Sequence, residues 1–377
     1  MDIKEFFQDA VRKQASDIFL IPGMPLAMKI NGRIEPVGEE KVFPAEMDNY
    51  IREIYAISGN RDMTRIQEQG DDDFSFSIVG LSRFRASVMK QRGSLAAVIR
   101  IVRFDLPNPA DIHIPETVLN IASMKKGMVL VTGAAGSGKS TTLACVIDRI
   151  NQTRNAHVIT LEDPIEYQID GISQVAVHPK IGLTFARCLR SILRQDPDLI
   201  VVGEIRDRET AEMSVHAALT GHLVFSTLHT NTAVGAVSRL LDLGVDSYLV
   251  ASALKGIVAQ RLLRRLCLQC RTAYAVGENS WERTYFSLKG PLHLFHASSC
   301  AHCRGTGYSG RLAVQEVFPF DEACRQAAAR GLGEKALLEL GRQQQVASLF
   351  EDGRAKVLAG ETSPEEMLHV LGPLEKK

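Results

Sequence analysis

The sequence predicts an α/β protein in which a small α+β domain precedes a larger domain built on a mostly parallel β-sheet. In the larger part of the 377-residue chain, short apolar runs alternate with helical segments, as in a parallel sheet covered by helices. In the first hundred residues, several strand-like segments alternate apolar and polar residues, as in an antiparallel sheet. A proline-rich stretch separates the two parts.

Residues 1–104 are predicted to form the small α+β domain. Apolar residues at helical spacing follow Asp2, which is a suitable helix cap. The predicted strands are 18–21, 26–30, 34–37, 74–78, 83–88 and 95–102, and 43–57 is predicted to be helical. Asn31-Gly32 is a hairpin signal between the second and third strands.

Residues 105–115 contain Pro107, Pro109 and Pro115 and are predicted to be a semi-rigid linker. The larger domain is predicted to cover residues 116–377. Its predicted strands are 128–131, 157–161, 199–202 and 223–227, and its last segment, 321–377, has a helical composition.

Composition narrows the possible functions. Lys plus Arg and Asp plus Glu both number 44, and this balance argues against general electrostatic capture of nucleic acid. No apolar run approaches the ~20 residues that span a bilayer, and the acidic N-terminus does not resemble a signal peptide. We therefore expect a cytoplasmic protein, in which the seven cysteines are reduced and paired cysteines are metal ligands rather than disulfides.

The strongest motif is a glycine-rich segment between a predicted strand and a predicted helix. It reads Gly133-Ala134-Ala135-Gly136-Ser137-Gly138-Lys139-Ser140-Thr141 and fits the pattern G-x-x-x-x-G-K-[ST]. Glycines let backbone N–H groups turn toward phosphates, and the helix directs its positive N-terminal end at the same anion. The motif predicts ATP binding, with Lys139 at the β- and γ-phosphates and the Ser140 hydroxyl holding Mg²⁺.

Acidic residues follow two of the predicted parallel strands. Glu204 ends the strand 199–202, and ligands of open parallel sheets bind at the carboxyl ends of strands, so Glu204 is expected near Mg²⁺ and the γ-phosphate. A carboxylate there can orient or activate water. Glu162, Asp163 and Glu166 follow the strand 157–161, and the sequence leaves open which of them faces the site. His222 and His229 flank the strand 223–227, where a γ-phosphate sensor is plausible.

Two C-x-x-C pairs, Cys267/Cys270 and Cys300/Cys303, predict a structural Zn²⁺ site with four thiolate ligands. His302 ranks below Cys303 as the fourth ligand. Four thiolates leave no open coordination position, so a catalytic zinc is not expected. Cys145, Cys188 and Cys324 are interpreted as small core residues.

Just before the first pair, 261–266 combines three arginines with three leucines. We interpret it as a helix that packs on its leucines. The alternative is a contact with a neighbouring subunit or a membrane-platform protein.

Together, five motifs resemble one family closely: the type II secretion and type IV pilus ATPases, hexameric motors of the RecA-like superfamily. The motifs are Gly133–Thr142, Glu162–Glu166, Arg194–Asp198, Val202–Asp207 and the segment from Gly221-His222 to His229. The resemblance runs from about residue 15 to residue 370. It implies a RecA-like phosphate-loop domain, a PAS-like N-terminal domain and a C-terminal part with a zinc knuckle and helices.

The resemblance also implies roles for individual residues. Glu204 and Glu166 match the catalytic or metal-positioning acids, and His222 and His229 match residues that report the nucleotide state. Arg85 and Arg100 match arginines that relatives present to a neighbouring nucleotide. Ala134-Ala135 replace the Pro-Thr of many relatives, which is expected to alter loop stiffness more than chemistry.

The function implied by the resemblance is a homo-hexameric ATPase that powers pilus or pseudopilus assembly at the inner face of a membrane. Its implied partners are an inner-membrane platform protein and a cytoplasmic adaptor. The tetracysteine pattern and the tail 349–363 resemble assembly and secretion motors, and the Ala-Ile-Arg motif of retraction motors is absent. The short N-terminal domain, however, resembles retraction and competence-pilus motors, so retraction is the alternative. Two further alternatives are a DNA-translocating ring, which the neutral charge disfavours, and a scaffold that does not hydrolyse ATP, which the intact Lys139 and acids disfavour.

Overall fold

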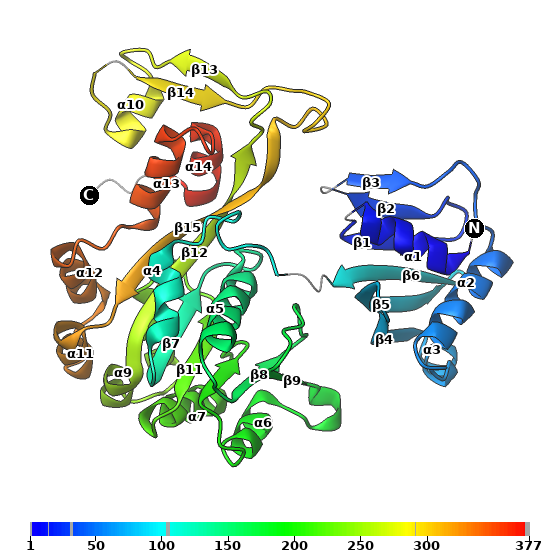
Figure 1. Cartoon of the computed structure of the whole chain (residues 1–377), viewed down its shortest axis with the longest axis horizontal. Coiled ribbons are helices and arrows are strands. Elements are labelled where there is room, and N and C mark those ends of the chain that lie inside the picture. The colour runs from blue at the N-terminus through cyan, green and yellow to red at the C-terminus, as the bar shows by residue number, and fades with distance from the viewer. Residues whose placement is uncertain (1, 14, 31–32, 103–105, 291, 374–377) are drawn as a thin grey trace. The chain divides into compact units, whose positions relative to one another are not determined.

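A computed structural model describes residues 2–13, 15–30, 33–102, 106–290 and 292–373 (Figure 1). The chain divides into two compact units, 1–105 with 166–168, and 106–377 without that short segment. The predicted Asn31-Gly32 turn lies outside the described residues.

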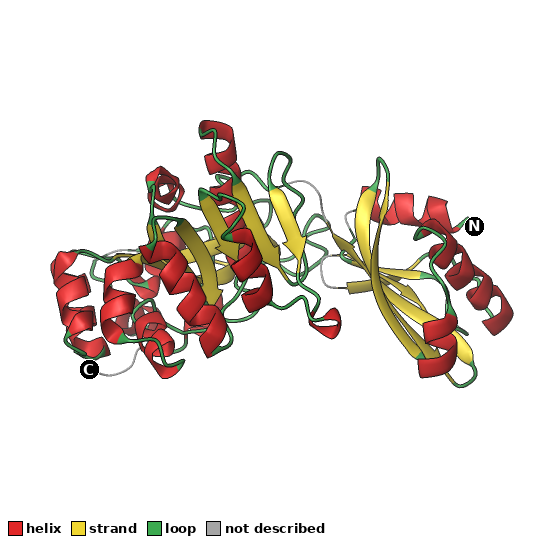
Figure 2. Ribbon diagram, turned by 90° about the horizontal axis from the view of Figure 1, so that it is seen from below, coloured by secondary structure: helices red, strands yellow, loops and turns green. Residues whose placement is uncertain are grey.

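The N-terminal unit is an antiparallel sheet with helices on one face (Figure 2). Its strands are β1 (Asp17–Leu20), β2 (Ala27–Ile30), β3 (Arg33–Pro36), β4 (Asp71–Ile78), β5 (Ser82–Gln91) and β6 (Ser94–Val102), in the order β3-β2-β1-β6-β5-β4. Its helices are α1 (Ile3–Arg12), α2 (Pro44–Ile57) and α3 (Thr64–Gln69). The predicted Asp2 cap is confirmed, because its carboxylate accepts the Lys4 N–H at 3.0 Å.

The second unit is built on a seven-stranded sheet in the order β15-β12-β7-β11-β10-β8-β9. The strands are β7 (Gly127–Thr132), β8 (Val158–Glu162), β9 (Ser173–Ala176), β10 (Leu199–Val202), β11 (Leu223–Leu228), β12 (Leu254–Leu266) and β15 (Tyr308–Pro319). All neighbouring pairs are parallel except β12 and β15. The predicted α/β class with a mostly parallel sheet is therefore confirmed.

Helices and a small hairpin complete this unit. The helices that alternate with the parallel strands are α4 (Glu116–Leu119), α5 (Lys139–Thr153), α6 (Phe185–Ile192), α7 (Arg208–Leu219), α8 (Gly235–Asp242) and α9 (Ser247–Ala253). Between β12 and β15 lie β13 (Thr272–Ala275), α10 (Trp281–Phe286) and β14 (His293–His296). The predicted helical tail is confirmed as α11 (Glu322–Ala329), α12 (Glu334–Gln343), α13 (Leu349–Leu358) and α14 (Pro364–Leu371).

The central strands are buried on both faces, as expected for a parallel sheet between helices. Their side chains form one continuous apolar core with α6, α7 and α9. The proline-rich stretch also belongs to this unit: the Ala313 N–H donates to the Ile112 carbonyl at 3.3 Å, and Ile114 is buried.

The interpretation of 261–266 as a helix was wrong, because these residues form the second half of β12. The spacing of Leu262, Leu263 and Leu266 fits a helical face, but β12 pairs with β7 on one side and β15 on the other. The partner strand β15 begins 42 residues after β12 ends, at Tyr308 against Leu266. A pairing over that separation leaves little trace in local periodicity.

Candidate functional site

The glycine-rich loop joins the carboxyl end of β7 to the start of α5. Gly133, Gly136 and Gly138 all have positive φ angles, of 152°, 76° and 85°. A Cβ at Gly133 would lie 2.4 Å from the Gln260 carbonyl oxygen, so this position has neither the conformation nor the space for a side chain. Together with the N–H groups of the first turn of α5, the loop has the conformation of a phosphate cradle.

Lys139 is the first residue of α5 and is largely buried. Its ammonium donates to the carbonyls of Gly133 at 2.9 Å and Ala134 at 3.0 Å, so the side chain folds back across the loop. The Lys139 ammonium is thus held against the backbone of a loop that is suited to an anion. Ser140 and Thr141 follow on the first turn of the helix.

The loop after β11 is tied to the strand that leads into the phosphate loop. The Gly133 N–H donates to the Leu228 carbonyl at 3.3 Å, and the Thr230 N–H donates to the Thr132 hydroxyl at 3.0 Å. His229 lies between these two attachments and is half-exposed. It is therefore held at the same edge of the sheet as the phosphate loop.

Glu204 and His229 lie beside one another, although 25 positions separate them. Glu204 Oε2 lies 3.5 Å from His229 Nε2, and Glu204 Oε1 lies 2.6 Å from Arg206 Nη2. Only 13% of the Glu204 side chain is exposed. The hydrogen bond to Glu204 raises the pKa of the Arg206 guanidinium, as expected for a cation beside a carboxylate. Strand order places β11 between β7 and β10, so Glu204 is two strands, or about 10 Å, from the phosphate-loop strand.

The other acids take different positions. Glu162 ends β8, and its carboxylate accepts hydrogen bonds from Thr160 Oγ1 at 2.7 Å and Gln174 Nε2 at 3.0 Å. Asp163 is exposed, and Glu166 is exposed four residues beyond the end of β8.

His222 is not brought together with these residues. It precedes β11, its carbonyl accepts the N–H of Gly127 at the start of β7, and its ring lies 3.0 Å from the Ala217 carbonyl. Because β7 and β11 are parallel, His222 is at the edge of the sheet opposite the phosphate loop, roughly 20 Å away.

The two arginines predicted in the N-terminal unit are direct cross-strand neighbours. Arg85 of β5 faces Arg100 of β6 in the antiparallel register. Arg85 is exposed, and the Arg100 guanidinium also pairs with Asp17 at 3.1 Å. This sheet face therefore presents two adjacent guanidinium groups.

Two residues at the phosphate loop were missed from the sequence. Gln260, on β12, is 1% exposed and donates from Nε2 to the Ser137 carbonyl at 2.7 Å. Arg261 binds the Asn231 side chain at 3.0 Å, and burial lowers the pKa of its guanidinium. The available signal was the polar pair Gln260-Arg261 between the apolar residues 257–259 and 262–263. The helical interpretation began at Arg261 and left Gln260 unassigned.

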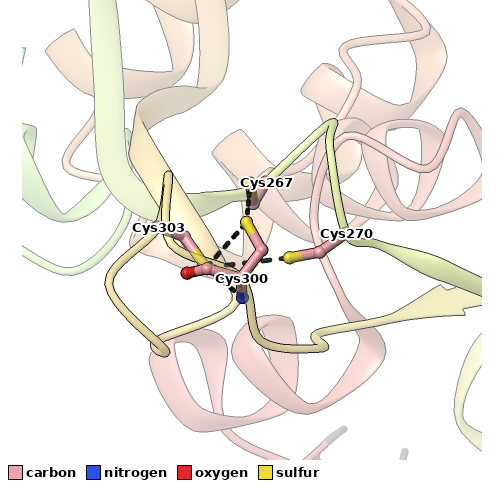
Figure 3. A group of neighbouring side chains, drawn as sticks. All are labelled: Cys267, Cys270, Cys300 and Cys303. Carbon is pink, nitrogen blue, oxygen red and sulfur yellow. Dashed lines mark hydrogen bonds between the residues drawn. The ribbon is translucent and has the colours of Figure 1, made fainter.

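The four predicted cysteines converge at the far end of the β12–β15 pair (Figure 3). Their sulfur atoms lie within 4.8 Å of one another, with Cys267–Cys300, Cys270–Cys303 and Cys300–Cys303 separations of 3.8, 3.7 and 3.7 Å. A tetrahedral zinc site with Zn–S bonds of about 2.3 Å requires sulfur atoms about 3.8 Å apart. The cluster thus fits a tetrahedral thiolate site, and His302 is exposed outside it.

Backbone groups support a thiolate at Cys303. Burial would raise the pKa of this thiol. The N–H groups of Cys300 and Gly307, at 3.4 and 3.2 Å from the sulfur, and hydrogen bonds from the Cys270 and Cys300 thiols outweigh burial and lower the pKa to about 6. The remaining cysteines, Cys145, Cys188 and Cys324, are buried, which confirms their interpretation as core residues.

A parallel sheet with a phosphate loop, a lysine folded across that loop and a carboxylate at the carboxyl end of a strand two places away defines a phosphate-loop nucleotide-binding protein. The chain belongs to the family described as type II/IV secretion system protein, which it matches over residues 1–369. The family predicted from the sequence is thereby confirmed.

Three similar proteins illustrate this family. The chain is 38% identical to the type II secretion system ATPase E of Vibrio cholerae, over 98% of the chain and 74% of that protein. It is 36% identical to the type IV pilus assembly ATPase PilB of Thermus thermophilus, over 97% of the chain and 42% of that protein. The crystal structure of the pilus retraction motor PilT with bound ADP superimposes with a TM-score of 0.77 at 31% identity, over 98% of this chain and 96% of that one.

The cysteine cluster generates a prediction. Cys300→Ser should remove one of four ligands and reduce bound zinc from about one per chain to nearly none, with a lower unfolding temperature. Structural zinc sites contribute about 10 kcal/mol of apparent binding energy in small peptides, so the loss should be large. Elemental analysis and thermal unfolding are the measurements. Cys324→Ser, which alters a buried cysteine outside the cluster, is the matched control; zinc-free wild-type protein purified without chelator would contradict the assignment.

Proposed function

We propose that this protein is an ATPase motor that powers assembly of a type IV pilus or of the pseudopilus of a type II secretion system. The observation that carries the proposal is that the phosphate loop with Lys139 and the Glu204–His229 pair lie at the same edge of the parallel sheet. The names of the V. cholerae and T. thermophilus relatives supply the biological direction.

In this proposal the loop Gly133–Thr141 holds the ATP phosphates, with Lys139 at the β- and γ-oxygens. The Ser140 hydroxyl would hold Mg²⁺, which neutralises phosphate charge when bound. Glu204 orients the attacking water, because it is a shielded carboxylate beside the phosphate edge, and His229 contacts Glu204. Glu166 supports the metal or the water. His222 receives no role at the phosphates of its own chain.

The roles of Lys139 and Glu204 can be separated by mutation. Lys139→Ala should abolish both nucleotide binding and turnover, since it removes the cation from the loop. Glu204→Gln should keep nucleotide binding but lower kcat by about 10²–10⁴, because it removes the carboxylate and little volume. Fluorescent nucleotide titration and phosphate release are the measurements. Near wild-type turnover by Glu204→Gln would refute the assigned role.

The proposed working form is a homo-hexamer in which Arg85 and Arg100 act on a nucleotide held by a phosphate loop. Paired guanidinium groups suit the charge that develops on a transferring phosphoryl group.

Mixed rings test whether the site is shared between subunits. Arg85→Ala should lower kcat more than it weakens ATP binding, because the guanidinium acts on transition-state charge. Mixing Arg85→Ala with Lys139→Ala subunits should then restore part of the activity. The active sites would combine the intact phosphate loop of an Arg85→Ala subunit with the intact Arg85 of a Lys139→Ala subunit. Arg33→Ala, an exposed arginine on strand β3, is the matched control and should leave kcat unchanged. Absence of recovery in demonstrably mixed rings excludes a shared site.

The cysteine cluster is proposed to hold structural Zn²⁺, since four thiolates leave no position for a substrate. The proposed partners are an inner-membrane platform protein and a cytoplasmic adaptor, and the proposed location is the cytoplasmic side of the inner membrane, reached through those partners. Among the described residues, no helix has the length and apolar character needed to cross a bilayer. No direct role is proposed for nucleic acid.

Assembly and retraction make opposite predictions for the cell. Deleting the gene should remove surface pili or stop pseudopilus-dependent secretion if the protein drives assembly. An excess of pili instead would indicate retraction, the function named for the PilT structure. Electron microscopy of surface filaments, with the Lys139→Ala gene as a control for loss of ATPase activity alone, is the measurement.

A further inference from the structure

Gln260 is a buried side chain that contacts the phosphate loop from a different strand. Ala259 of β12 pairs with Thr132, the last residue of β7, so Gln260 is level with the start of the loop. Its side chain is 1% exposed although an amide is costly to bury without partners. The structure supplies those partners, and they belong to the nucleotide machinery.

The Gln260 amide bridges the loop and the helix that follows it. Nε2 donates to the Ser137 carbonyl at 2.7 Å, and Oε1 accepts from the Thr142 hydroxyl at 2.7 Å. The backbone carbonyl of Gln260 also packs against Gly133, where a Cβ would lie 2.4 Å away. One residue therefore contacts the beginning and the end of the loop and the first turn of α5.

The orientation of this amide is determined by its surroundings. The Ser137 carbonyl can only accept, so the nitrogen of Gln260 must face it and the oxygen must point the other way. On that side Gln315 Nε2 donates to Gln260 Oε1 at 2.6 Å. Gln315 lies directly opposite Gln260 in the β12–β15 pairing and is itself 4% exposed. Its backbone N–H is fixed in turn by the Asp352 carboxylate of α13, at 2.8 Å.

We propose that Gln260 is a positioning residue for nucleotide binding, and that Gln315 acts on the nucleotide only through Gln260. The two amides form a relay from β15 across β12 to the phosphate loop. The relay fixes the Ser137 carbonyl away from the phosphates and holds the loop N–H groups turned toward them. This inference rests on the proposed binding of ATP at Gly133–Thr141.

Gln260→Met keeps the length of the side chain and removes its three hydrogen bonds, to Ser137, Thr142 and Gln315. Since one hydrogen bond changes an equilibrium constant by about two- to twelvefold, we expect the dissociation constant for a fluorescent ADP analogue to rise about tenfold. KM for ATP should rise in parallel. The turnover number kcat should change less than about threefold, because a positioning residue touches no reacting atom. Gln315→Met should raise the dissociation constant about threefold.

A double-mutant cycle distinguishes the relay from simple loss of stability. If Gln315 acts only through Gln260, then Gln315→Met has no effect on nucleotide affinity once Gln260→Met is present. Val314→Ala is the matched control: this buried neighbour of Gln315 points to the opposite face of β15, so it should lower the unfolding temperature and leave affinity unchanged. Equal effects of Gln315→Met in both backgrounds, or wild-type affinity of Gln260→Met, would overturn the proposal.

Two further measurements keep the outcome decisive. If Gln260→Met does not fold, Thr142→Val is the alternative variant, because it removes only the hydroxyl bound to Gln260 Oε1. Thr142→Val should weaken nucleotide binding twofold or more. Wild-type affinity of Thr142→Val would overturn the relay. Lys139→Ala separates this inference from the proposed function. If wild-type protein binds nucleotide and Lys139→Ala does not, wild-type nucleotide affinity of Gln260→Met refutes the relay but not the proposed function. If wild-type protein does not bind nucleotide, the proposed function itself fails.

Discussion

The parallel register of β7 with its two neighbours is the constraint on which the site depends. Thr132 is opposite Leu228 on one side and Ala259 on the other, so three strands meet where the phosphate loop begins. Backbone hydrogen bonds fix this register, and buried side chains on both faces of β7 oppose slippage. The contacts around the phosphate loop, from His229 to Gln260, follow from that alignment.

The charges at this edge are paired before any ligand is considered. The Lys139 ammonium donates to two loop carbonyls, and Glu204 contacts the Arg206 guanidinium through one carboxylate oxygen and the His229 ring through the other. The cation and the carboxylate therefore have separate partners.

The β12–β15 pair connects two chemically different regions. Near the middle of the pair, Gln260 contacts the phosphate loop and Gln315 contacts Gln260. The four cysteines gather at the far end of the pair, where Cys267 follows Gln260 by seven residues. The tail reinforces the same strands, because the Glu366 carboxylate binds both the N–H and the guanidinium of Arg264. A metal at the cysteines would therefore stabilise a strand that also supports the loop, without entering its chemistry.

The sequence by itself determined the elements whose signals are local: the phosphate loop between a strand and a helix, the C-x-x-C pairs, the alternating N-terminal strands and the helical tail. It did not determine β12, because the leucines at 261–266 fit a helical face, and only pairing with the distant β15 selects the strand. The placement of β12 also created the Gln260 contact, and the parallel register of β11 with β7 put His229, not His222, at the phosphate-loop edge. Contacts across a sheet join residues far apart in sequence, so the tertiary structure alone decided them.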